Sequence, residues 1–177
     1  MFKFSTLANA SVFAAISLVS FHLPGTLAIA DPQLETTAPQ SQRVKVFLPK
    51  NPGQQGNLGY VEPVWRQTYT TSVAQFAIAQ VIAGPTVQER QRGFTAPIKL
   101  RGASNCGKDF TLSITSNVAR LQFCRQVVSG GIGDDARMTS SLNATLKQFP
   151  TVRSVVLLDQ RGNCLGDMSG ENRCLRR

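Results

Sequence analysis

The sequence is short of several residue types on which catalytic sites depend. Its single histidine, His22, lies near the N-terminus, so residues 31–177 contain no imidazole. This excludes Ser-His-Asp and Cys-His nucleophilic sites, and histidine-ligated zinc or copper, from that part of the chain. Aromatic residues make up only 7% of the chain, with one tryptophan, Trp65, and two tyrosines, Tyr60 and Tyr69. A platform for stacking sugars can therefore involve only a few positions.

Long apolar runs are scarce too, and the one near the N-terminus has the features of a secretory signal. Lys3 supplies a positive charge, residues 6–21 are mostly apolar, and Ala28-Ile29-Ala30 is a pattern that signal peptidases cut. An uncleaved anchor is the alternative, but a bilayer requires about 20 predominantly apolar residues and this run is shorter. We predict a signal peptide over residues 1–30, export to the periplasm or the extracellular space, and no transmembrane segment after cleavage.

Acidic residues are few, with 10 Asp and Glu against 19 Lys and Arg. One of the 19, Lys3, falls in the predicted signal peptide, which leaves residues 31–177 with a net charge of +8. A basic exported domain is attracted to anionic surfaces such as wall polymers, lipid head groups and acidic sugars, although the same charge can serve solubility alone. Nucleic acid is not expected as a partner, because the chain is predicted to be exported and has no run of Lys and Arg.

Cysteine is limited to four residues, Cys106, Cys124, Cys164 and Cys174. An even number in an exported chain predicts two disulfides, for which three pairings are possible. Local geometry favours Cys106–Cys124 and Cys164–Cys174. A hairpin turn at Ser116-Asn117 places Cys124 opposite a position only three residues from Cys106, and the second pair closes a short loop. A zinc site is the alternative, but the spacings contain no C-x2–4-C pair.

Apolar periodicity predicts a single α+β domain. We expect it to be a two-layer sandwich, with a mostly antiparallel sheet, two main helices packed on it, and two disulfides. The predicted parts are a flexible linker over residues 31–42, the domain over 43–160 and a disulfide-closed extension over 161–177. Strands are expected over residues 43–48, 60–66, 98–101, 110–115, 118–123 and 152–158, and helices over 73–83 and 134–149, with a capping box at 86–89.

Paired carboxylates are the remaining route to catalysis. A glycosidase needs two of them about 5–10 Å apart across a cleft. Each candidate here has a structural explanation, such as a helix start or a turn, so we predict no catalytic residue, no metal and no cofactor. The alternatives are a carboxylate-dependent cell-wall hydrolase and a calcium site at Asp167 and Glu171. These candidates are Glu62, Asp109, Asp134, Asp135, Asp159, Asp167 and Glu171.

Three motifs occur in an order typical of a known family. The first is Arg43-Val44-Lys45-Val46-Phe47-Leu48-Pro49, the second is Ala83-Gly84-Pro85-Thr86, and the third runs from 148 to 155 as QFPTVRSV. Over residues 43–160 the chain resembles the GerMN domain of sporulation and spore-germination proteins. The resemblance implies an α/β envelope domain without known catalytic residues, implicated in envelope assembly and cell-wall-associated events. This chain differs in having one copy of the domain and a disulfide-closed extension.

The sequence therefore predicts a non-catalytic envelope domain. Its expected partner is peptidoglycan or another anionic envelope polymer, or an envelope protein, with contact near the strand edge at Pro63 and the glycines of 130–133. Tyr60 and Trp65 should point to opposite faces of their strand, so that at least one belongs to the core. The candidate binding residues are Lys45, Lys50, Trp65, Arg66 and Arg101.

Overall fold

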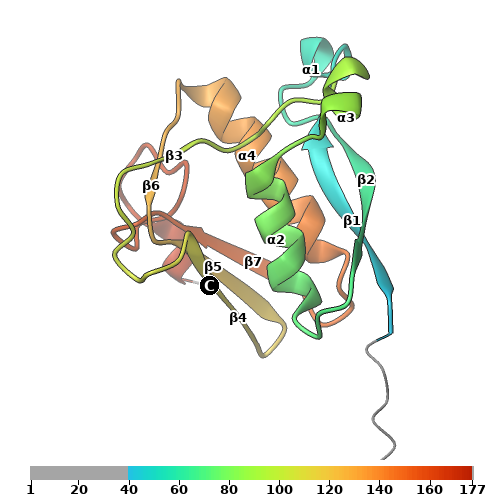
Figure 1. Cartoon of the computed structure of the whole chain (residues 1–177). Coiled ribbons are helices and arrows are strands. Elements are labelled where there is room, and N and C mark those ends of the chain that lie inside the picture. The colour runs from blue at the N-terminus through green and yellow to red at the C-terminus, as the bar shows by residue number, and fades with distance from the viewer. Residues whose placement is uncertain (1–39, 177) are drawn as a thin grey trace, which may run out of the picture. The chain divides into compact units, whose positions relative to one another are not determined.

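The computed structural model describes residues 40–176 (Figure 1), so the predicted signal peptide and most of the predicted linker lie outside the described residues. Within this range the chain alternates strands and helices, which cover most of the segments that periodicity predicts. The elements are β1 Gln42–Pro49, α1 Gly53–Gly56, β2 Val61–Thr68, α2 Val73–Ala83, α3 Val87–Gln91, β3 Leu100–Arg101, β4 Phe110–Thr115, β5 Val118–Phe123, β6 Gln126–Val127, α4 Ile132–Lys147, β7 Ser154–Leu158 and the 3-10 helix η1 Arg173–Arg176.

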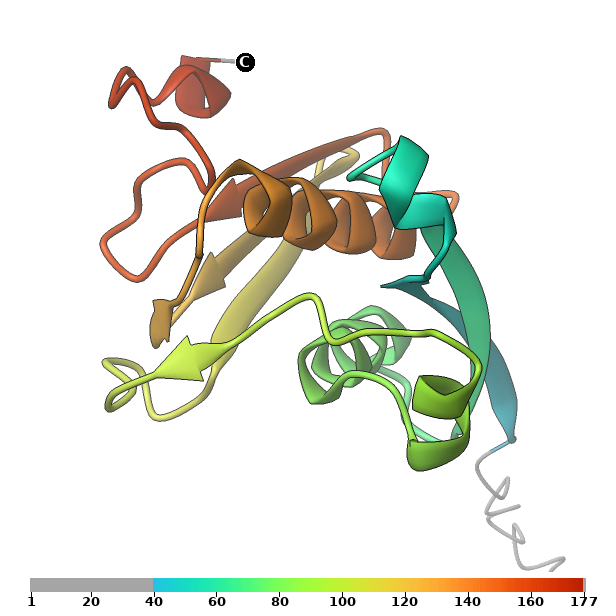
Figure 2. The ribbon, with the colours of Figure 1, turned by 90° about the horizontal axis from the view of Figure 1, so that it is seen from above.

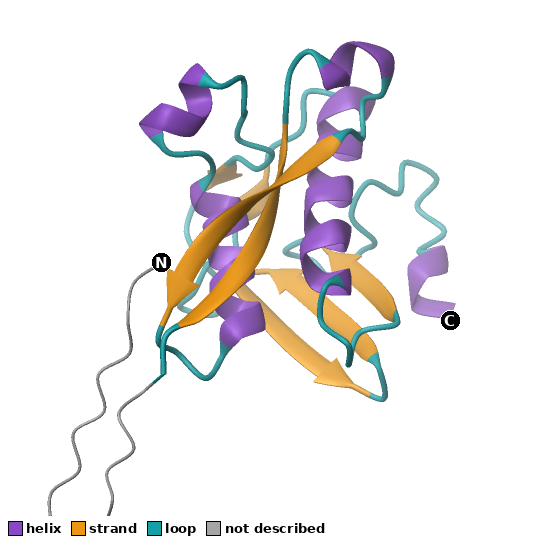
Figure 3. Ribbon diagram, turned by 90° about the vertical axis from the view of Figure 1, so that its right-hand side faces the viewer, coloured by secondary structure: helices purple, strands orange, loops and turns teal. Residues whose placement is uncertain are grey.

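Strands β1 and β2 form an antiparallel hairpin that stands apart from the other strands (Figure 3). Their register runs from Gln42 opposite Thr68 to Pro49 opposite Val61. Alternation along β1 turns Val44, Val46 and Leu48 inward, where all three are buried. This inner face packs against α2 and α4, so one face of the hairpin is covered and the other points outward.

The second sheet has the order β4-β5-β7. Strands β4 and β5 are antiparallel, whereas β7 lies parallel to β5 and is reached through α4. Such a crossover is needed because parallel neighbours cannot be joined by a tight turn. A separate pair, β3 with β6, lies beside this sheet, on the side far from the hairpin (Figure 2).

Helices α2 and α4 lie between the hairpin and the three-stranded sheet (Figure 1). Both helices contribute side chains to one apolar core, which also includes side chains of the hairpin and of the three-stranded sheet. On α4, Met138, Leu142 and Leu146 recur at the spacing of a single helix face and are almost fully buried. Their partners include Val46, Leu48, Val64, Ile78, Val81, Phe110, Leu121, Phe123 and Leu157.

Comparison with the sequence-based expectations confirms the α+β class, the two main helices and both disulfides. The strands pair in three separate groups, and β7 adds a parallel neighbour to a sheet that is otherwise antiparallel. The capping box is present: the Thr86 hydroxyl accepts from the Glu89 N–H, and the Glu89 carboxylate accepts from the Thr86 N–H. The short helix α1, between the two hairpin strands, is not among the helices that periodicity predicts.

Residues 159–176, here called the C-terminal strap, fold back over the outer side of β7. The Cys164–Cys174 disulfide closes this segment, and Cys164 forms a β-bridge with Leu158. Leu157 faces the main core, so its neighbour Leu158 points the other way, yet Leu158 is only 1% exposed. Leu158 thus lies on a second buried face of β7, beside the edge along which the strap pairs with this strand. Among the helices of residues 40–176, none is long and apolar enough to cross a bilayer.

Candidate functional site

The outer face of the β1–β2 hairpin carries the most distinctive group of exposed side chains. Lys45 lies directly opposite Trp65 in the register, and Arg43 is two residues away on the same face of β1. The Arg43 guanidinium carbon lies 4.8 Å, and the Lys45 Nζ 5.4 Å, from the centroid of the Trp65 ring. Trp65 is nevertheless 51% exposed. The face thus presents an indole with two cations against it and half of its surface open.

The hairpin is positioned by polar contacts along the free edge of β1. The Lys45 N–H donates to Oε1 of Gln148 at 3.0 Å, and Nε2 of Gln148 donates to the Lys45 carbonyl at 2.7 Å. The Phe47 N–H donates to the Thr145 hydroxyl at 3.0 Å. Side chains of α4 and its C-terminal turn thereby replace the neighbouring strand that β1 lacks on this side. The backbone beneath Lys45 is fixed, while its side chain remains on the outer face.

Arg66, although adjacent to Trp65, points to the other side of β2. Its Nη1 and Nη2 atoms donate to Oε1 and Oε2 of Glu89 at 2.6 and 2.7 Å, and both side chains are nearly buried, at 13% and 11% exposure. These hydrogen bonds lower the pKa of Glu89 from 4.5 to about 2, with a further contribution from the Thr86 N–H. The Arg66 guanidinium binds the Glu89 carboxylate and so anchors α3 to β2, which leaves it unavailable to a ligand on the outer face.

Lys50 is engaged at the far end of the hairpin. Its Nζ lies 2.7 Å from Oε2 of Glu62 and 5.2 Å from the centroid of the Phe94 ring. The other Glu62 oxygen accepts from the Tyr60 hydroxyl at 2.8 Å, and the pKa of Glu62 is lowered, first by the Lys50 hydrogen bond and then by that of Tyr60. Lys50 therefore contributes little free positive charge to the outer face.

Of the five predicted binding residues, only Lys45 and Trp65 have their side chains against each other. Arg66 reaches Trp65 only at its backbone, where Nη1 donates to the Trp65 carbonyl at 3.2 Å. Arg101 lies on β3, on the far side of the helices from the hairpin (Figures 1 and 2). Arg43 was not among the candidates, although its spacing of two from Lys45 could have identified it. The expectation that Tyr60 or Trp65 belongs to the core is wrong: they are 37% and 51% exposed. Trp65 is exposed because no other element of residues 40–176 covers the outer side of the hairpin, whereas Tyr60 precedes β2 and its hydroxyl donates to Glu62 at the hairpin end.

The outer face is also uniform in charge. Within the described part of the chain, the side chains that alternation places on this face include no carboxylate. Within residues 40–176 neither Arg43 nor Lys45 forms an ion pair, so the two cations produce a positive potential over the exposed indole. The outward positions are Arg43, Lys45, Phe47, Pro63, Trp65 and Gln67.

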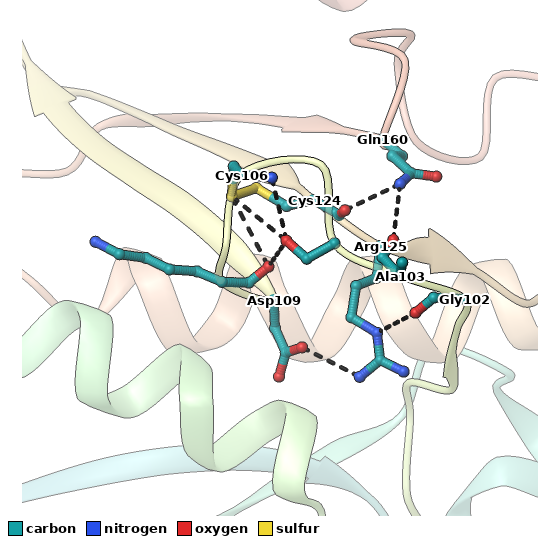
Figure 4. A network of polar contacts seen from close by, with 9 residues as sticks. Gly102, Ala103, Cys106, Asp109, Cys124, Arg125 and Gln160 are labelled. Atoms are coloured by element: carbon teal, nitrogen blue, oxygen red, sulfur yellow. Dashed lines mark hydrogen bonds and ion pairs between the residues drawn. A yellow bond between two sulfur atoms is a disulfide. The ribbon is translucent and has the colours of Figure 1, made fainter.

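The Cys106–Cys124 disulfide lies at the opposite end of the domain in a dense polar network (Figure 4). Gln160 donates to the carbonyl of Cys124 at 3.0 Å and to that of Ala103 at 3.3 Å. Arg125 donates to the Gly102 carbonyl at 2.9 Å and forms an ion pair with Asp109 at 3.2 Å. These contacts fix a loop and account for Asp109 without catalysis. The predicted pairing of all four cysteines is confirmed.

A cavity of about 430 Å³ lies between the C-terminal strap and the start of α4. Its walls include Asp135, Asp159 and Asp167, three of the seven carboxylates considered above. Asp159 accepts from the N–H groups of Arg161 and Asn163 in a turn. Asp167 accepts from Ser169, which lowers the pKa of its carboxyl group. Two of the three are thus engaged in holding the strap.

The remaining carboxylates are paired as well. Asp134 accepts from Arg137 and from the Gly130 N–H, and both hydrogen bonds lower its pKa. Glu171 forms an ion pair with Arg173. Over residues 40–176, no three side chains of His, Cys, Asp and Glu are grouped so as to hold a metal ion.

Comparison with known proteins adds a likeness of fold. No protein-family model matches the sequence, and no curated protein is similar to it. The solved tandem GerMN domains of the sporulation protein GerM from Bacillus subtilis are 20% identical, with a TM-score of 0.47 over 68% of this chain. The fold resembles the GerMN domain. The chain spans 39% of that GerM structure.

A second solved structure, described as a lipoprotein from Clostridium perfringens, is 16% identical with a TM-score of 0.38. That similarity covers 72% of this chain and 80% of the other. At these identities neither similarity bears on function, which we argue from the residues alone.

Proposed function

We propose that this protein is a non-catalytic domain of the cell envelope that binds an anionic envelope polymer, such as peptidoglycan, through the outer face of the β1–β2 hairpin. One observation carries the proposal: an exposed indole, Trp65, lies in contact with two cations, Arg43 and Lys45, on a face without carboxylates. An anionic chain gains charge pairing and apolar contact at the same place.

The location in the envelope is part of the same proposal. The signal-like segment over residues 1–30 supports export. Both disulfides agree with it, because such bonds persist in oxidising compartments and are rare in the cytosol of mesophiles. In the periplasm or outside the cell, the abundant anionic partners are wall and surface polymers.

The chemistry of the described residues supports a binding role over catalysis. Residues 31–177 contain no histidine, and all four cysteines are oxidised, so the common nucleophile–base pairs are missing. A general acid needs a pKa close to the working pH. The four carboxyl groups with a resolved shift, Glu62, Glu89, Asp134 and Asp167, all have a lowered pKa and so remain ionised near neutrality.

Co-sedimentation with purified peptidoglycan sacculi at low and high salt tests this function. We expect wild-type protein to pellet with sacculi, and the double variant Arg43→Gln/Lys45→Gln to remain in solution. Arg101→Gln, which removes an exposed charge far from the hairpin, is the matched control and should pellet like wild type. Salt should weaken the binding, because charges contribute to it.

Two results contradict the proposed function. Wild-type protein that stays in solution at both salt concentrations does not bind this polymer, and cross-linking in intact envelopes would then be needed to find a protein partner. Equal loss of binding in Arg101→Gln and in the hairpin variant would show that net charge alone acts, without a defined surface.

A wall hydrolase is the second candidate, because Asp135, Asp159 and Asp167 line one cavity. If these residues are catalytic, the protein should release soluble fragments from sacculi, and Asp159→Asn or Asp135→Asn should abolish the release. We expect no turnover by the wild-type protein, since Asp159 and Asp167 accept hydrogen bonds from turns of the strap. Catalytic fragment release would replace the binding role with an enzymatic one.

A further inference from the structure

Resting on the proposed function, we infer the class of polymer: a glycan whose sugar rings themselves carry carboxylates, bound with one ring against Trp65. The inference depends on two properties of the hairpin face. The first is the exposed indole surface, and the second is the distance between this surface and the two cations. Together they specify a ligand that offers a flat ring and a negative charge a few ångströms apart.

The indole is suited to a sugar ring. One side of a pyranose presents several C–H groups, whose weak positive polarisation matches the negative face of an aromatic ring. Trp65 is 51% exposed, so part of the indole stays open to a sugar ring although the Arg43 and Lys45 side chains lie over it. A polyanion without rings, such as polyglutamate, has charge but nothing to cover the indole. The aromatic side chain therefore selects for a glycan among anionic polymers.

The cations define where the charge of the ligand must lie. The Arg43 guanidinium carbon and the Lys45 Nζ lie 4.8 and 5.4 Å from the indole centroid. A carboxylate bonded directly to a stacked sugar ring lies within reach of both cations, and a guanidinium can hold it through two parallel hydrogen bonds. A charge at the end of a long flexible arm gains less from this geometry, because the arm must be ordered on binding.

A neighbouring amide completes the surface. Gln67 lies opposite Arg43 in the register and on the same outward face. Its Nε2 donates to the Ser41 hydroxyl at 2.5 Å, which leaves its carbonyl oxygen and its second N–H for the hydroxyl groups of a sugar. Residues two apart on a strand are separated by about 7 Å, so the group formed by Arg43, Lys45, Trp65 and Gln67 contacts only a short stretch of the glycan.

The single tryptophan of the chain allows a direct test. Because Trp65 is that residue, the tryptophan fluorescence of the protein reports on the proposed site and on nothing else. The purified protein is titrated with four probes: oligogalacturonate, with ring carboxylates; chitohexaose, a neutral glycan; polyglutamate, with carboxylates but no sugar; and oligothymidylate, with phosphates and stacking bases. We expect a saturable fluorescence change with oligogalacturonate, and binding weaker by about tenfold or more for the other three.

Variants measured by calorimetry separate stacking from charge. Trp65→Ala should weaken the binding of oligogalacturonate by about tenfold, whereas Trp65→Phe should keep part of the affinity. Arg43→Gln should weaken it by a similar factor and reduce its dependence on salt. Tyr69→Ala removes another exposed aromatic side chain, 61% exposed and just beyond β2, and should change nothing. Thermal unfolding of each variant shows that the fold is retained.

The outcomes distinguish the two proposals. If polyglutamate or oligothymidylate binds as tightly as oligogalacturonate, the glycan class is wrong, and the binding of anionic polymers stands. If no probe binds but sacculi still bind in a manner sensitive to Arg43 and Lys45, the ring-carboxylate inference is likewise overturned and the envelope function survives. If oligogalacturonate binds but sacculi do not, the ring-carboxylate inference stands and peptidoglycan, whose carboxylates lie on side arms and peptide stems, is not the polymer. If neither probes nor sacculi bind, both proposals fail.

Discussion

The β1–β2 hairpin and the β4–β5–β7 sheet pack on the same two helices but are secured differently. The hairpin is held by side-chain contacts: Gln148 and Thr145 along the edge of β1, and the Arg66–Glu89 pair behind β2. The sheet is secured covalently, by Cys106–Cys124 near the end of β5 and by the disulfide-closed strap over β7.

The difference teaches where a small domain can keep a free surface. The contacts that position the hairpin within residues 40–176 come from its inner face or its edge, so its outer face retains an exposed indole and two cations that form no ion pair with these residues. At the sheet, the strap covers the outer side of β7 and introduces carboxylates instead. The proposed function assigns partner contact to a face that these stabilising contacts do not use, and the following variants test that separation.

The largest expected effect is on stability and comes from the Cys106–Cys124 disulfide. Replacing both cysteines with alanine should lower the free energy of unfolding by about 3 kcal/mol, because the cross-link restricts the unfolded chain. Urea denaturation measures this loss. Binding to sacculi by the folded variant should equal that of wild type, and a loss of binding in step with stability would break the separation between the two regions.

Next in size is the Arg66–Glu89 pair. Glu89→Gln should cost about 2 kcal/mol, since it leaves the nearly buried guanidinium without its charged partner. The pKa of Glu89 is lowered on folding, so its stabilising contribution is present above pH 4.5 and disappears as the pH falls towards about 2. Urea denaturation across this pH range should show a flatter profile for the variant than for wild type.

An exposed ion pair provides the control for that measurement. Asp109→Asn breaks the Asp109–Arg125 pair, whose side chains are 46% and 34% exposed. Such pairs are worth less than about 1 kcal/mol, so this variant should stay close to wild type. A loss equal to that of Glu89→Gln would contradict the special role we assign to the pair behind β2.

The edge of β1 should respond more weakly. Thr145→Val keeps the volume of a fully buried side chain but leaves the Phe47 N–H without its acceptor, which should cost about 1–2 kcal/mol. Hydrogen exchange at the Phe47 amide should accelerate, with little change at amides of β5. Thr145→Ser retains the hydroxyl and should preserve the protection, which separates the hydrogen bond from packing.

The smallest effect on stability is expected for the outer face itself. Arg43→Gln/Lys45→Gln removes two exposed cation–π contacts and should change the free energy of unfolding by less than about 1 kcal/mol. The same variant should lose binding to sacculi. Thermal unfolding beside co-sedimentation checks both, and a strongly destabilised variant would show that these cations are structural.

Short-range patterns were sufficient to predict the disulfide end of the domain. A turn at Ser116-Asn117 fixes Thr115 opposite Val118, and both turn residues adopt the positive φ angles typical of such hairpins. The Cys124 N–H then donates to the Asp109 carbonyl at 2.8 Å. Register, once set by the turn, determined which cysteines could meet.

The candidate site could be predicted only in part, because it depends on how elements pack. Alternation placed Lys45 on an outward face, but its contact with Trp65 requires the exact pairing of β1 with β2. The partner of Arg66 comes from α3, whose approach to β2 has no local signal. Because packing between elements has no local signal, the predictions of an exposed Arg66 and of a core position for Trp65 or Tyr60 were both wrong.

The closure of β1 by Thr145 and Gln148 has a consequence for how the chain is built. The hydrogen bond between Phe47 and Thr145 joins residues that are 98 positions apart in the sequence, and the bond between Lys45 and Gln148 spans 103 positions. A chain synthesised from its N-terminus therefore exposes β1 long before the residues that complete its edge exist. During that interval the strand offers unpaired N–H and C=O groups to any other extended chain. The topology therefore requires that nascent molecules be kept apart until α4 has been synthesised.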